Sequence, residues 1–185
     1  MKILNKLRYA DDDVTPLGRL LLMRAPSLFL GLFLGLFLSF ITSEFEEVLA
    51  RNVQIAFFIP FVVYMADAVG TQTQSIYTRD LVTGKASFKR YLVKETFIGL
   101  IFGLLFSVIA GGAVYLWLRS GQVSMAVFLG MFGAVASAPV ISMVVAEILE
   151  LEHSDPAVGA GPIATVIQDT SSVLIYGLVC SAVFL

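Results

Sequence analysis

The chain has 185 residues, of which 58% are hydrophobic, and its mean hydropathy is +0.89. In a soluble domain about half of the residues are apolar, so this composition predicts a polytopic membrane protein. A formal net charge of -2 provides no basic surface for nucleic acid. One cysteine and one histidine exclude a disulfide framework and a cluster of thiolate or imidazole metal ligands.

Residues 1–23 are predicted to form a cytoplasmic segment ahead of the membrane domain. Apolar and basic residues are mixed there, which suits a short amphipathic helix on the membrane surface; a solvated tail that only helps to set the topology is an equal alternative. Thr15 and Pro16 suit a helix start. The first strong apolar run begins near Leu20 and lacks a short h-region with a cleavage site, so we expect no cleavable signal peptide.

Several apolar segments are long enough to cross about 30 Å of hydrocarbon, which needs about 20 helical residues. The gaps between them are short and polar and leave no room for a soluble domain. The fold class is therefore predicted to be all-α, a polytopic membrane protein whose five transmembrane helices fill residues 24–185. We expect the spans near residues 24–43, 53–78, 92–118, 123–147 and 156–185.

The positions of Lys and Arg predict the orientation of the bundle, because cytoplasmic loops hold the excess of positive charge. Of the 12 Lys and Arg residues, only Arg51 and Arg119 fall outside residues 1–24 and 79–94. This pattern places the N-terminus and residues 79–94 in the cytoplasm and the C-terminus outside. We expect the protein in the plasma membrane, surrounded by lipid.

Small residues at helical spacing predict where helices approach closely, because little hydrophobic force drives helices together in lipid. Pro60 and Pro139 fall inside the predicted spans two and four, where they are expected to kink the helices or to free backbone carbonyls as ligands. The small-residue sets are Gly31 with Gly35, Gly99 with Gly103, and Gly130 with Ala134 and Ala138.

Asp67 lies well inside span two. An ionisable group at membrane depth is expensive and is therefore a functional-site hypothesis by default. At a helical rise of ~1.5 Å per residue, Asp67 is about 21 Å from Val53 and about 16 Å from Thr78. Thr71, Gln74 and Thr78 follow at helical spacing and share its face. We do not expect this face to point at lipid.

Asp169 lies at a similar depth in span five, about 21 Å from Asp155 and about 24 Å from Leu185 along a helix. Asp155 itself suits an N-cap, because a proline follows it. The face of Asp169 also carries Pro162, Thr165, Ser172 and Tyr176.

Carboxylate, hydroxyl, amide and carbonyl oxygens without histidine or thiolate are the ligands of hard cations such as Mg²⁺, Ca²⁺ and Mn²⁺. No Lys or Arg lies near mid-membrane to pair with Asp67 or Asp169. Their expected partner is therefore an exchangeable cation or a proton. The alternative for each aspartate is a protonated carboxyl group that hydrogen-bonds between helices.

Spans two and five resemble the corresponding helices of the MgtE magnesium channels and their eukaryotic solute-carrier relatives. Span five is the closer match, with Asp155-Pro156-Ala157-Val158-Gly159-Ala160-Gly161-Pro162 followed by Thr165 and Asp169. In span two the matching residues are Phe58-Ile59-Pro60, Met65-Ala66-Asp67-Ala68-Val69-Gly70-Thr71-Gln72 and Arg79. Glu95 and Gly99 of span three and the Arg24 to Pro26 stretch also fit, so the resemblance covers about residues 20–185.

The resemblance implies a homodimer in which spans two and five of each subunit line the pore. It implies Mg²⁺ as the transported ion, held largely hydrated at Asp169, with Asp155 at the cytoplasmic mouth; Mn²⁺ or Ca²⁺ are alternatives. The expected ion contacts are Asp169, Asp67, Asp155, Thr165 and Thr71, and the expected pore lining also includes Gly70, Gln72, Gln74, Pro162 and Ser172.

Two departures from the family pattern affect these expectations. The family usually has Gly-Gly-Asn where this chain has Ala66-Asp67-Ala68, so an amide is replaced by a carboxylate one position earlier. One residue along a helix is a rotation of about 100°, so the metal preference is open. The large cytoplasmic magnesium-sensing domains of bacterial MgtE are also missing, so regulation is expected from the N-terminal segment or from a separate protein.

Two other functions are weighed against ion passage. A proton- or sodium-coupled transporter would use Asp67 and Asp169 as a relay. An intramembrane aspartyl protease would use them as a shared-proton dyad, but neither aspartate follows a Gly-x-Gly sequence. We therefore expect a transporter rather than an enzyme.

Overall fold

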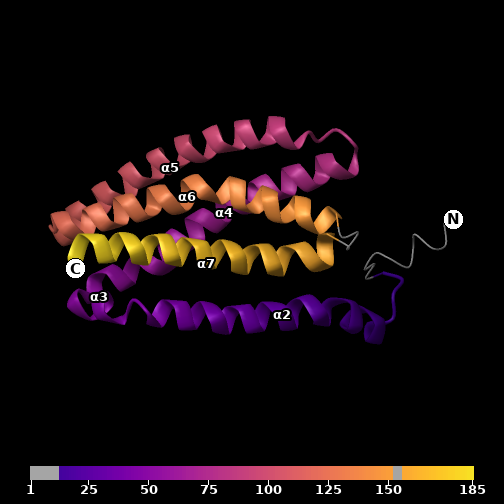
Figure 1. Ribbon diagram of the computed structural model, residues 1–185, viewed down its shortest axis with the longest axis horizontal. Helices are drawn as coiled ribbons and strands as arrows, with labels where there is room; N and C mark the ends of the chain where they lie inside the picture. Colours follow the sequence, from indigo (N-terminus) through magenta and orange to yellow (C-terminus); the bar gives the residue numbers. More distant parts are fainter. Residues whose placement is uncertain (1–12, 152–155) are drawn as a thin grey trace.

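A computed structural model describes residues 13–151 and 156–185 of the chain. This part of the chain is helical apart from its connections, which confirms the predicted all-α class, and it contains five helices long and apolar enough to cross a membrane. Figure 1 shows the long helices running side by side along the molecule. They are α2 (Leu17–Ser43), α4 (Ile59–Val82), α5 (Phe88–Leu118), α6 (Gly121–Leu151) and α7 (Pro156–Phe184).

Helix α2 begins earlier than the predicted first span. It starts at Leu17, directly after Pro16, whose ring fixes φ at -58°. Residues 17–23, which we assigned to the N-terminal segment, therefore continue the helix of the first span. The predicted helix start at Thr15 and Pro16 agrees with this boundary, whereas the predicted surface helix in the first residues lies largely outside the described part of the chain.

The predicted second span is divided into two elements. A short helix α3 (Glu46–Arg51) leads into the 3-10 helix η1 (Val53–Phe58), and α4 begins only at Ile59. Asn52 starts η1 by accepting a hydrogen bond from the backbone N–H of Gln54 at 3.0 Å. Pro60 therefore lies in the first turn of α4, where its missing N–H costs no helical hydrogen bond. The proline predicted inside span two thus lies within the candidate span Val53–Leu81, in the first turn of α4 and not at a kink.

Helix α6 is the centre of the bundle and packs against α5, α4 and α7, whereas α2 packs on α7 at the edge (Figure 1). Small residues allow these close approaches, as predicted. A Cβ on Gly99 would lie 2.5 Å from the carbonyl oxygen of Ala136, and one on Gly103 would lie 3.1 Å from that of Phe132. The contact predicted for Gly35 is not made within the protomer, because no atom lies within 4 Å of a Cβ built there.

Two apolar clusters of different size fill the interior. The larger one includes Val62, Met131 and Val135 and occupies the half of the bundle nearer the α5–α6 turn. There the hydroxyl group of Tyr176 donates a hydrogen bond of 2.8 Å to the backbone oxygen of Ile55, which ties α7 to η1. The smaller cluster lies nearer the α4–α5 turn, and its buried members are Tyr77, Met143 and Ala146.

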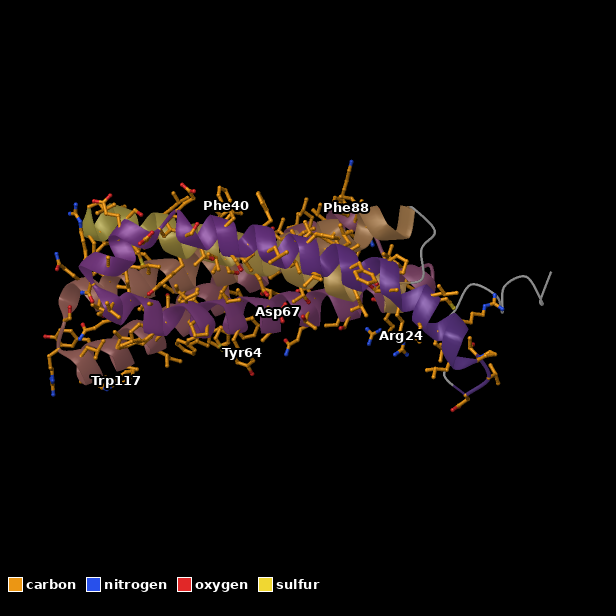
Figure 2. The ribbon with its side chains drawn as sticks, turned by 90° about the horizontal axis from the view of Figure 1, so that it is seen from below. Arg24, Phe40, Tyr64, Asp67, Phe88 and Trp117 are labelled. Carbon is orange, nitrogen blue, oxygen red and sulfur yellow. The ribbon has the colours of Figure 1, made fainter. Side chains whose placement is uncertain are left out.

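The outer surface of the described bundle is rich in exposed apolar side chains, as in a helix bundle whose solvent is lipid. Trp117 is 69% exposed at one end of the molecule, and Figure 2 shows it far from Arg24 at the other end. An exposed tryptophan at a helix end suits a membrane interface.

Candidate functional site

Asp67 lies on α4 near the middle of the length of the bundle, between Trp117 and Arg24 along the long axis (Figure 2). Its side chain is half-buried. Thr71 lies one helical turn later on the same face, with its hydroxyl group near the carboxylate. A carboxylate has about four acceptor positions, so Asp67 has positions for further ligands.

Asp169 lies on α7 and is also half-buried. It is close enough to Asp67 for the two negative charges to interact. The structure thus brings together two aspartates that are about 100 residues apart in sequence, because α4 and α7 pack against each other. Like charges in one site repel unless a cation or a proton lies between them.

Polar side chains extend this site along the surface of the protomer. Thr71 and Gln72 are exposed, and Gln74 is half-buried on the same helix. Thr165 is exposed one turn before Asp169 on α7. A polar stripe of this kind is not expected to face hydrocarbon, because its donors and acceptors would have no partners there.

Other expected lining residues lie away from this stripe. Gly70 and Ser172 are packed inside the protomer. Ser172 donates a hydrogen bond of 2.9 Å to the backbone oxygen of Gln168 and accepts one of 3.2 Å from its Nε2 atom. Asp155 lies outside the described residues, and the side chain of Pro162 is not among those that the structure describes.

Gln168 was not recognised from the sequence, although it directly precedes Asp169. Its side chain is 1% exposed, and its Oε1 atom has no hydrogen-bond partner in the described part of the protein. A Cβ on Gly70 would lie 3.5 Å from this oxygen and would collide with Oγ of Ser142 on α6. The available signal was an amide next to Asp169 in a membrane-spanning helix, because a buried amide needs a hydrogen-bond partner.

The described residues contain no group of three or more His, Cys, Asp or Glu side chains close enough to hold a metal ion. Asp67, Asp169 and the hydroxyl group of Thr71 are therefore the strongest ligands that one protomer provides in this region. This small set suits an ion that keeps most of its water, as Mg²⁺ usually does in proteins.

The chain matches the family model of MgtE, described as a divalent cation transporter, over residues 59–179. The matched region begins with α4 and ends near the end of α7, so it contains both Asp67 and Asp169.

Magnesium transporters named MgtE are similar to this chain in three bacteria. The protein of Bacillus subtilis is 30% identical over 156 residues, which cover 83% of this chain and 35% of the relative. That of Enterococcus faecalis is 27% identical, covering 80% and 33%. That of Thermus thermophilus is 27% identical, covering 75% and 31%. The chain thus spans about a third of the length of these relatives.

These matches confirm the family that the polar residues of spans two and five indicated. With five candidate spans, the chain is an integral membrane protein, and its family is one of transporters rather than enzymes. The match over residues 59–179 is longer than half of the chain. The chain therefore belongs to the MgtE family of divalent cation transporters.

Proposed function

We propose that this protein carries Mg²⁺ across the plasma membrane, along a path lined by α4 and α7 of two copies of the chain. The observation that carries the proposal is the pair of half-buried aspartates, Asp67 and Asp169, brought together from these two helices. Residues 52–78 and 154–185 contain no Lys or Arg. A cation is therefore the natural partner of the pair.

The properties of Mg²⁺ support this choice of ion. It requires oxygen ligands, loses water reluctantly and is usually bound through one or two carboxylates. Asp169 is proposed as the central ligand, and Asp67, whose charge interacts with it, as a second one. Thr165 lies one turn away and is placed to contact water molecules around the ion. The relatives described above are named magnesium transporters.

The second copy is proposed because one protomer leaves the polar stripe uncovered. Thr71, Gln72 and Thr165 are exposed on the surface of the described bundle. A second copy facing this stripe would enclose it and double the number of carboxylates around the ion. The N-terminus is proposed to be cytoplasmic and the C-terminus outside, with Asp155 at the cytoplasmic mouth, as the positions of Lys and Arg indicate.

The test is Mg²⁺ uptake into proteoliposomes by wild type and Asp169→Asn. The amide keeps the shape of the side chain and removes its charge, so uptake should fall at least about tenfold, as is typical when a metal site is altered. Glu44→Gln is the matched control, because Glu44 is an exposed acidic residue in the turn after α2. Uptake by Asp169→Asn equal to that of wild type would remove Asp169 from the path.

A further inference from the structure

Helix α4 is linked to its neighbours by a set of polar contacts that the transport path does not use. Thr73 donates a hydrogen bond of 2.8 Å to Oε2 of Glu95 on α5. Tyr77 donates one of 2.5 Å to Oε2 of Glu147 on α6.

The third contact of the set runs from α5 to α4. The hydroxyl group of Tyr91 on α5 donates to the carboxylate of Asp80 on α4. Each of these three hydrogen bonds joins side chains of two different helices. All of them involve α4, and all lie in the half of that helix nearer the α4–α5 turn.

The three residues of α4 share a face that differs from the face of the proposed path. Thr73, Tyr77 and Asp80 are four and three residues apart, which is helical spacing. Thr73 comes two residues after Thr71, a rotation of about 200° at ~100° per residue. Tyr77, three residues after Gln74, is only about 60° from it at ~100° per residue, so the contacts lie on a neighbouring side of α4 and not on the face of the path.

Burial distinguishes the first two contacts from ordinary surface hydrogen bonds, whereas Asp80 and Tyr91 of the third are only partly buried. Thr73 is 4% exposed, Tyr77 is 0% exposed and Glu95 is 7% exposed. When a buried carboxylate loses its hydrogen-bond partner, the free energy of its desolvation is no longer compensated. Loss of such a bond therefore destabilises the protein.

Apolar packing around residues 73–82 is less extensive than in the other half of the bundle. The apolar cluster there has Tyr77, Met143 and Ala146 as its buried members, whereas the cluster in the other half is much larger. Helix α4 packs mainly on α6 and α7 and touches α5 only briefly. The polar contacts therefore add to the packing of Tyr77 against Tyr91 and Phe88 in holding residues 73–82.

We propose that Glu95, Tyr91 and Glu147 are positioning residues for the ion path. With Thr73, Tyr77 and Asp80 they form a clamp, called here the α4 clamp, that holds residues 73–82 and so sets how far Thr71, Gln74 and Thr78 stand from the ion. The effect on transport rests on the function proposed above, whereas the effect on the helix can be measured without it.

The test combines hydrogen exchange with transport in the full chain in lipid nanodiscs and liposomes. Thr73→Val and Tyr77→Phe each remove one hydroxyl group and keep the volume of the side chain. Backbone amides of residues 73–82 should exchange about tenfold faster in both variants, the effect of losing one net hydrogen bond, while residues 59–69 keep the wild-type rate. Mg²⁺ uptake should change in both variants, and Thr73→Ser, which retains the hydroxyl group, should restore exchange and uptake.

Ser124→Ala is the matched control. Ser124 on α6 donates a hydrogen bond of 2.8 Å to the backbone oxygen of Gly111 on α5, so this variant also loses a bond between helices, but one without α4. Its residues 73–82 should exchange at the wild-type rate. Wild-type exchange in both Thr73→Val and Tyr77→Phe, or equally fast exchange in Ser124→Ala, would overturn the clamp. A wild-type chain without Mg²⁺ uptake would overturn the proposed function alone.

Discussion

Asp67 and Asp169 have different surroundings, and this difference gives them different expected roles. The hydroxyl group of Thr71, one turn later on α4, lies near the carboxylate of Asp67. Asp169 is placed by the packing of α7, with its neighbour Gln168 fully buried beside it. Asp67 is therefore a second charge next to the proposed central ligand, and it should influence which ion the site prefers more than whether an ion passes.

Removal of this second charge should alter ion preference. In Asp67→Asn the side chain keeps its size, but the site loses one negative charge per chain, so competition by Mn²⁺ and Ca²⁺ against Mg²⁺ uptake should change about tenfold. Competition assays in proteoliposomes measure this effect. Ser75→Ala on the same helix, where Ser75 is exposed, is the control. Unchanged competition in Asp67→Asn would assign Asp67 to packing.

At the scale of single helices, α4 depends on a small residue where it meets α6 and α7. Gly70 is buried at this crossing, and a Cβ there would collide with Ser142. Gly70→Ala should therefore displace the hydroxyl group of Ser142 and overpack this crossing, which destabilises the protein by about 1–3 kcal/mol. Thermal unfolding in detergent measures the loss. Gly112→Ala on α5, where a Cβ meets nothing within 4 Å, should leave the midpoint unchanged or slightly higher; equal midpoints for the two variants would contradict the close contact.

Helix periodicity predicted one face of α4 and not the other. Asp67, Thr71, Gln74 and Thr78 stand out because polar residues in an apolar run need an explanation, and their spacing alone places them together. The face that carries Thr73 could not be predicted, because its hydrogen-bond partner Glu95 lies on another helix and is brought near only by packing.

The ends of the helices show the same limit. Hydropathy predicts five spans and places Pro60 inside the second, without showing where in that span the α-helix begins. Proline is tolerated in the first turn of a helix as well as at a kink, so the sequence alone does not choose between the two. The structure places it in the first turn of α4, after η1.

At the scale of the whole molecule, the polar stripe of α4 and α7 is exposed on a single copy, which supports the proposed dimer. Purified protein in detergent should therefore have twice the 20.1 kDa mass of one chain. Light scattering, corrected for bound detergent, or native mass spectrometry measures this mass. A single-chain mass that persists across detergents and protein concentrations, together with Mg²⁺ uptake, would show that one copy is sufficient.

The central place of α6 also has a consequence for biosynthesis. Among the described helices, α2 packs mainly on α7, and α4 and α5 meet each other only briefly. The three long helices made first therefore have little surface to share when they leave the ribosome, and chains are made from the N-terminus. Stable assembly has to wait for α6, which joins α4 to α5, and then for α7, which provides the surface for α2. Until then, Asp67 lies on a helix without its main partners, so its ionisable side chain has to be accommodated by the insertion machinery or by lipid.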